Sequence, residues 1–108
     1  MEKQEIDAIL SKLNRAEKAE LAGRLVGELL NTWPGIEKTP GVAGGEACIT
    51  RTRIPVWVVE NYRRVGWSEA EILENYPSLR AADLVNAWSY AGAHREEIDS
   101  AIRANQED

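Results

Sequence analysis

The sequence predicts a mainly α-helical protein with one small β-hairpin. Apolar residues recur at helical spacing over most of the chain, whereas prolines and glycines are concentrated between residues 32 and 48. We expect an N-terminal helical region over residues 1–31 and a helical domain that carries the hairpin over residues 32–108. A chain of 108 residues buries only a modest core, and small proteins of this kind often complete it by oligomerising.

The first 31 residues predict two helices that form an αα-hairpin. Asn14 and Glu17 occupy the N-cap and N3 positions of a capping box at the start of the second helix, and Asn31 is a suitable terminator. Such a pair cannot bury its apolar stripe alone, so it must pack on the rest of the chain or on another chain. The stripe consists of Ile6, Ile9, Leu10 and Leu13 in the first helix and of Leu21, Leu25, Val26, Leu29 and Leu30 in the second.

The segment between the two helical regions predicts a β-hairpin. Residues 36–38 and 47–50 are candidate strands on either side of a glycine-rich turn at residues 41–45. An isolated hairpin is only marginally stable in water, so helices or the strand of a partner must support it.

Three further helices are predicted after the hairpin. Pro55 begins the first, over residues 55–65, and Gly66 closes it. Ser68 and Glu71 form a capping box that starts a short helix at residues 69–75. A longer helix runs over about residues 81–92, with an apolar face of Leu84, Val85, Trp88 and Ala91, and it can continue past Gly92 through Ile98 and Ile102.

The lengths of these three helices match a trihelical helix-turn-helix unit. In that interpretation the third helix is presented to the major groove of DNA by its N-terminal residues. Its expected exposed positions are Arg80, Ala82, Asp83, Asn86 and Ser89. Arg80 and Asn86 suit base recognition, whereas Asp83 opposes a phosphate backbone. Three short helices are also a common way to build a core, so a role without DNA stays open.

The distribution of charge restricts the kinds of molecule that the protein can bind. The net charge of -5 argues against a protein that coats nucleic acid without specificity. Residues 49–64 nevertheless hold four arginines against one glutamate, a local charge of +3 that can hold a specific acidic ligand. One cysteine, Cys48, cannot form an internal disulfide and we expect it to be a small buried residue. No signal peptide or membrane span is recognisable, so we expect a cytoplasmic protein with no membrane partner.

No catalytic constellation is recognisable in the sequence. His94 has no companions at metal-ligand spacing, and the glycines at 41–45 lack the lysine of a phosphate-binding loop. The glutamates are scattered over helix surfaces. We therefore expect a protein that is not an enzyme and that has no cofactor and no metal site.

Three segments resemble the domain-of-unknown-function family 433. Residues 44–57, Gly-Gly-Glu-Ala-Cys-Ile-Thr-Arg-Thr-Arg-Ile-Pro-Val-Trp, are similar to the family signature, as are residues 66–77 and 87–91. The resemblance implies a winged-helix-like or helix-turn-helix fold, usually dimeric. It also implies a VapB-like antitoxin, which binds a PIN-like nuclease toxin through one segment and its own operator DNA through another.

The chain departs from the family pattern at three positions. Ala47 stands where proline is common, and Arg80 stands where Thr or Ser usually caps the last helix. Arg51 stands where glycine is common, so the backbone there is strained if that position requires a positive φ.

These observations lead to a hypothesis about function and to its rival. The first is an antitoxin-like regulator that binds a nuclease toxin and operator DNA as a homodimer, with Arg51, Arg53, Arg80 and Asn86 as contacts to nucleic acid or partner. Arg53 can instead tie the hairpin to its neighbours by bonding backbone carbonyls. The rival is a protein-interaction and dimerisation module with no DNA role, in which the N-terminal helices are the dimer interface.

Overall fold

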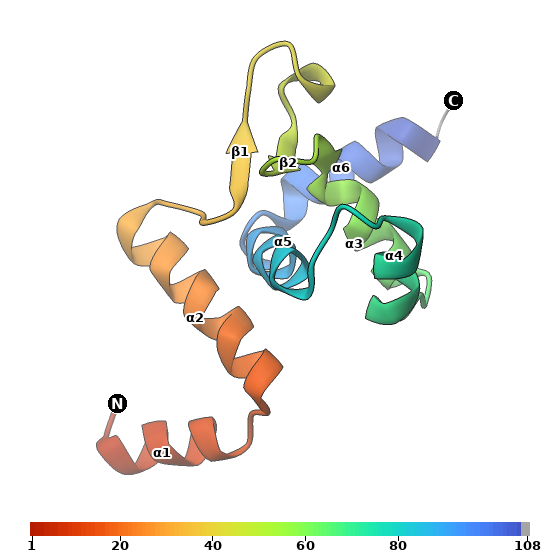
Figure 1. Cartoon of the computed structure of the whole chain (residues 1–108). Coiled ribbons are helices and arrows are strands. Elements are labelled where there is room, and N and C mark those ends of the chain that lie inside the picture. The colour runs from red at the N-terminus through yellow and green to blue at the C-terminus, as the bar shows by residue number, and fades with distance from the viewer. Residues whose placement is uncertain (107–108) are drawn as a thin grey trace.

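The computed structural model describes residues 1–106, and Figure 1 shows the order of their helices and strands. The protein is mainly helical with a small antiparallel sheet, as predicted. The elements are α1 (Lys3–Ser11), α2 (Arg15–Leu30), β1 (Ile36–Lys38), a 3-10 turn (Ala43–Gly45), β2 (Ala47–Ile49), β3 (Ile54–Pro55), α3 (Val56–Arg64), α4 (Glu69–Asn75), α5 (Ala81–Ala93) and α6 (Arg95–Gln106). No helix among the described residues is long and apolar enough to cross a membrane.

Helix α5 is the centre of the fold. It contacts α2, α3, α4, α6, β1 and β2, and seven of its thirteen residues are buried. Leu84 of α5 is fully buried together with Ile49, Val56, Val59 and Ile72, which come from β2, α3 and α4. The core therefore forms where α5 meets the sheet and the two helices that precede it.

The predicted hairpin is confirmed and extended by a third strand. β1 pairs with β2 in antiparallel register, with Ile36 opposite Ile49 and Lys38 opposite Ala47. β3 pairs with the other edge of β2, so β2 is the central strand. The sequence did not predict β3 because two residues are too few to show an alternating pattern.

Helix starts follow the local sequence closely. The Asn14 Oδ1 atom accepts a hydrogen bond from the backbone N–H of Glu17 at 2.8 Å, and the Glu17 carboxylate accepts one from the N–H of Asn14 at 2.9 Å. Ser68 and Glu71 exchange the same pair of bonds at 3.1 and 3.0 Å. Both predicted capping boxes are confirmed, and Asn31 ends α2 in the left-handed conformation at φ 52°.

The last predicted helix is interrupted at His94. Its backbone leaves the helical region at φ -123° and ψ 44°, and α6 begins at the next residue. The change of direction returns Ile98 and Ile102 to the core, where both are buried. A continuous helix would follow one axis, so burial of these residues against α3 requires the break.

Helix α2 packs closely along α5 because glycines line its inner face. A Cβ atom added at Gly23 would lie 2.7 Å from the Ser89 hydroxyl oxygen, and one added at Gly27 would overlap the ring of Trp33. Trp33 in turn packs edge-on against Tyr90 of α5, with ring centroids 5.8 Å apart. Gly23 therefore lets the α2 backbone approach α5, and Gly27 leaves room for Trp33 to pack against Tyr90.

Helix α1 does not form the predicted αα-hairpin with α2. The two helices occur where the sequence places them, but α1 projects away from the domain instead of folding back on α2 (Figure 1). None of its residues is buried. The protein is consequently elongated, with extents of 49 × 29 × 26 Å. Within residues 1–106, no packing buries the apolar stripe of α1.

Replacing Gly27 with alanine tests the close packing of α2. We expect Gly27→Ala to lower the free energy of unfolding by about 1–3 kcal/mol, because the new methyl group displaces Trp33. Gly92→Ala is the matched control, since the nearest heavy atom to its added Cβ is the mobile end of Arg24 at 3.5 Å. That variant gains helix propensity and should raise the free energy of unfolding by about 0.5–1 kcal/mol. Equal effects in urea denaturation would contradict this account of the interface.

Candidate functional site

The Asp83 carboxylate gathers two of the predicted site residues at the amino end of α5. The Arg51 Nη2 atom lies 3.1 Å from Oδ1 and 3.4 Å from Oδ2 of Asp83. The backbone N–H of Arg80, the residue before α5, donates to Oδ2 at 2.8 Å. The carboxylate side chain is only 9% exposed, whereas the side chain of Arg51 is 49% exposed. One buried acid therefore connects the turn after β2 to the start of α5.

The turn between β2 and β3 holds two arginines in the left-handed backbone conformation. Arg51 has φ 76° and Arg53 has φ 58°, a region that side chains with a Cβ atom seldom adopt. Thr52 closes the turn between them, because its hydroxyl donates to the carbonyl of Ile49 at 2.8 Å and accepts from the N–H of Ile54 at 3.0 Å. The strain expected at Arg51 is present, and it is tolerated in a turn that side-chain bonds hold in place.

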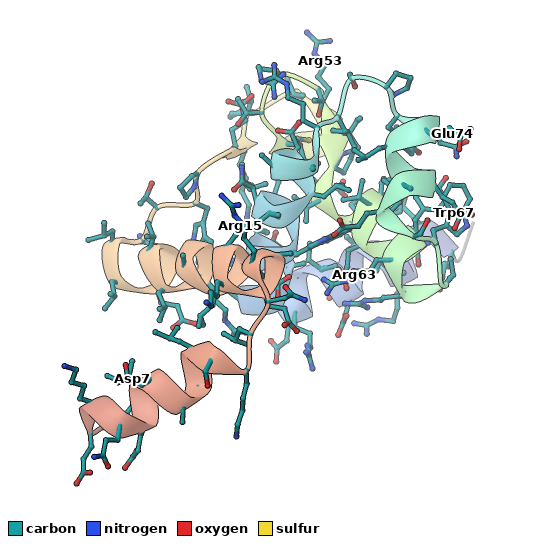
Figure 2. All side chains as sticks on the ribbon, turned by 60° about the horizontal axis from the view of Figure 1, so that its bottom comes forward. Asp7, Arg15, Arg53, Arg63, Trp67 and Glu74 are labelled. Atoms are coloured by element: carbon teal, nitrogen blue, oxygen red, sulfur yellow. The ribbon has the colours of Figure 1, made fainter. Side chains whose placement is uncertain are left out.

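Arg53 and Arg80 present free guanidinium groups to solvent. Both residues are exposed, and no group within residues 1–106 bonds to either guanidinium. Figure 2 shows the Arg53 side chain pointing outward from its turn. The alternative role of Arg53, a tie to backbone carbonyls, is therefore not observed in this part of the chain. Two cations remain available for an anionic partner near the positive end of the α5 dipole.

The outer face of α5 is covered beyond its first turn, which corrects two expectations. Ser89 is buried, and its hydroxyl donates to the carbonyl oxygen of Glu20 in α2 at 2.8 Å. Asp83 is buried as well. Asn86 is half-buried, and its amide lies against the backbone of Gly35. These side chains hold neighbouring elements, whereas Arg80 and Ala82 are exposed as expected.

A hollow of about 260 Å³ lies beside the strained turn. Its lining residues are Glu37, Thr39, Val42, Cys48, Arg51, Thr52 and Arg53. Cys48 is only 3% exposed, in agreement with the predicted small buried residue. Burial raises the pKa of its thiol, as do the negative charges of Glu46 and Glu37. The thiol is therefore protonated and poorly nucleophilic at neutral pH, and the hollow offers cations instead of a nucleophile.

A larger hollow of about 580 Å³ lies between α2, α3, α5 and α6. Most of the charged side chains that line this hollow form ion pairs with one another. Arg64 pairs with Glu60 at 2.9 Å and with Asp99 at 2.7 Å, and the bond to Glu60 raises the pKa of its guanidinium. Arg63 covers the ring of Trp88 at 4.7 Å. These contacts join α3 to α5 and α6, and they explain why the arginines at the end of α3 are structural.

A second network of hydrogen bonds joins β1 to α6 and was not predicted. Glu97 accepts hydrogen bonds from Lys38 at 2.8 Å and from the Tyr90 hydroxyl at 2.7 Å. Burial raises the pKa of Tyr90 to about 12, and the bond to Glu97 adds to that rise. Lys38 and Glu97 are 59 residues apart, so no local pattern reveals the pair. Among the described residues, no group of three His, Cys, Asp or Glu side chains is placed to hold a metal ion.

Comparison with protein families matches residues 36–91 to the family described as protein of unknown function DUF433. The chain belongs to the DUF433 family. It is also similar to a solved structure, the crystal structure of a DUF433 member protein from Anabaena variabilis ATCC 29413. The two chains are 38% identical, and the match covers 95% of this chain and 99% of the other, with a TM-score of 0.63. No curated protein matches the chain significantly.

The matched DUF433 region contains the arginine-bearing turn and the first eleven residues of α5. Arg51, Arg53 and Arg80 therefore all lie on the family domain, as does Asp83, which the sequence interpretation treated only as an obstacle to phosphate. A signal for its role was available, because Asp83 occupies the N3 position of α5 and its carboxylate can accept from the N-cap N–H.

Substitutions at Arg51 separate the strain of the turn from the contact to Asp83. We expect Arg51→Ala to lower the free energy of unfolding by about 1 kcal/mol or more, because the buried carboxylate loses a partner. Arg51→Gly loses the same contact but relieves the left-handed backbone, so it should be more stable than Arg51→Ala by about 1 kcal/mol. Urea denaturation of both variants measures the difference. Equal stabilities would mean that the turn is not strained at Arg51.

Proposed function

We propose that this DUF433 protein is an antitoxin-like regulator that binds its operator DNA and a PIN-like nuclease toxin as a homodimer. The observation that supports DNA binding is the set of cations at the amino end of α5. Arg53 and Arg80 have free guanidinium groups there, and Arg51 is held beside them by Asp83. The toxin half rests on the family resemblance.

In this proposal, α3, α4 and α5 act as a helix-turn-helix unit that meets DNA with the tip of α5. Because α2 covers the later turns of α5, the helix approaches the groove by its amino end instead of lying along it. Arg80 and the exposed residues Ala81 and Ala82 reach the groove, and the positive end of the α5 dipole favours a phosphate. The sheet that presents Arg53 takes the place of the wing in a winged-helix-like arrangement.

The charge distribution supports specific binding with few ionic contacts. The chain carries a net charge of -5, so phosphates are repelled from most of its surface and accepted only at the local cations. Each phosphate contact contributes about one unit to the slope of log affinity against log salt concentration. Affinity for the operator should therefore fall less steeply with salt than it does for a strongly basic DNA-binding protein.

Fluorescence anisotropy with a duplex from the DNA upstream of its own coding sequence tests the DNA half. We expect tighter binding to this duplex than to a scrambled one, and Arg80→Ala should weaken it by about tenfold or more. Arg53→Ala should weaken both duplexes and reduce the salt slope by about 1. Arg103→Ala, on the exposed end of α6, is the control and should change nothing. Equally weak binding of the wild type to both duplexes would reject operator binding.

The covered outer face of α5 favours a second candidate, a protein-interaction module with no DNA role. Buried Asp83 and Ser89 bind neighbouring elements and cannot read bases without disrupting the packing of the sheet turn and α2. In this case the helices form a scaffold, and Arg80→Ala leaves every partner bound.

Purification of the tagged protein from its native host at moderate salt tests the toxin half. We expect a small PIN-like nuclease to co-purify in stoichiometric amount and to be identified by mass spectrometry. The same nuclease should remain bound after Arg80→Ala, because the toxin-binding segment differs from the DNA-binding one. Recovery of a clean homodimer without a nuclease would contradict the antitoxin assignment.

A further inference from the structure

We infer that α1 and the outer face of α2 form a dimerisation arm that is exchanged between two copies of this chain. In the dimer, α1 of one protomer packs on α2 of its partner, and the reverse contact completes the symmetry. This inference deepens the homodimer of the proposed function by naming its contact surface. It does not depend on DNA or toxin binding.

The exposed apolar surface of the protein is concentrated on this arm. Leu29 is 79% exposed and Leu30 is 69% exposed. The other large apolar residues of α1 and α2 that are exposed are Ile6, Ile9, Leu10, Leu25 and Val26. Exposed apolar surface that is gathered on one arm in this way marks an interaction site.

The arm has two faces with different roles. On α2, Gly23 points toward Ser89 of α5 and Gly27 toward Trp33, whereas Leu25 and Leu29 lie on the opposite side of the helix at 100° per residue. Packing within the chain therefore covers the face of α2 that carries Gly23 and Gly27, and it leaves the face that carries Leu25 and Leu29 exposed. The apolar residues of α1 share one face of that helix, and Ile6, Ile9 and Leu10 are each 40–44% exposed.

Helix α1 needs a partner to remain helical. It has nine residues, and isolated helices shorter than about 12–15 residues are only marginally stable in water. It extends away from the domain in both views, so the described part of its own chain, residues 1–106, does not bury it (Figures 1 and 2). An apolar helix from a second molecule must supply the missing contact.

The charge of the arm favours a second copy as that molecule. Residues 1–31 hold five basic and six acidic residues, a net charge of -1, although the whole chain carries -5. A symmetric dimer brings identical surfaces together, so it requires a surface with little net charge of its own. A strongly basic or acidic partner would gain no electrostatic attraction from this face.

The geometry and the size of the surface suit exchange. In a closed αα-hairpin, the apolar stripe of α1 would cover the apolar stripe of α2 in the same chain. In the open arrangement, α1 can make the same contacts with α2 of a second chain. Without Leu30, which lies on the side of Gly23 at 100° per residue, the six other exposed side chains amount to roughly 500 Å² of apolar surface per chain, and two such surfaces reach the roughly 1,000 Å² that a specific interface needs.

Sedimentation equilibrium of the full chain at moderate salt tests the surface. We expect a dimer in the wild type, and Leu29→Asp should raise its dissociation constant at least a hundredfold. Val65→Asp is the matched control, because Val65 is 65% exposed at the end of α3 and lies outside the arm. It should leave the dimer intact. Circular dichroism and the urea midpoint verify that both variants fold. A monomeric wild type, or an unchanged dissociation constant for Leu29→Asp, would overturn the inference.

Cross-linking establishes whether the arms are exchanged. One chain carries Ile9→Cys and another, with a different tag, carries Leu25→Cys, and the two are mixed and treated with a short bismaleimide. The native Cys48 does not react because it is buried. Exchange yields a cross-linked heterodimer, whereas Val65→Cys in place of Ile9→Cys yields none. Cross-linking within a single chain that carries both substitutions, with no heterodimer, would show a closed hairpin and refute exchange. Loss of operator binding in a chain that still dimerises would reject only the proposed function.

Discussion

The burial of α5 is the constraint on which the rest of the structure depends. α2, α3, α4, α6 and the sheet all contact this helix, and its apolar residues supply much of the core. Its polar groups are satisfied by the same neighbours. Asp83 accepts from Arg51, Ser89 donates to the carbonyl of Glu20, and the Trp88 indole donates to Glu69 at 3.0 Å. A buried helix with polar side chains is stable only when each of them finds such a partner.

This arrangement limits where the protein can meet another molecule. Because α2 covers the later turns of α5, the amino end of that helix is the part that remains accessible, and three arginines lie around it. Two of those arginines occupy a turn that strains their backbone. Glycine would fit the same turn without that cost, so the arginine side chains have a use that offsets the strain. Contact with an anionic partner is the use that we propose.

The arm contrasts with the domain in how it obtains stability. Residues of the domain bury their apolar groups around α5, whereas α1 buries none and α2 buries only its glycine face. An exchanged arm would cover this exposed apolar surface and would also fix the distance between the α5 amino ends of the two protomers. Dimer formation and the proposed operator recognition would then be carried by different segments, residues 1–31 and residues 51–80, and could be lost separately.

The local sequence was sufficient to predict the starts of α2, α4 and α5 and the first two strands, because each depends on residues a few positions apart. The Asn14–Glu17 and Ser68–Glu71 bonds span three residues, and the hairpin strands flank one turn. The role of Asp83, the burial of Ser89 and the pairing of Lys38 with Glu97 depend on partners 32, 69 and 59 residues away. Periodicity marks which face of a helix is apolar, but only tertiary packing decides which neighbour covers it. For that reason the same pattern that predicted a closed αα-hairpin left α1 open, with its apolar face directed outside the chain.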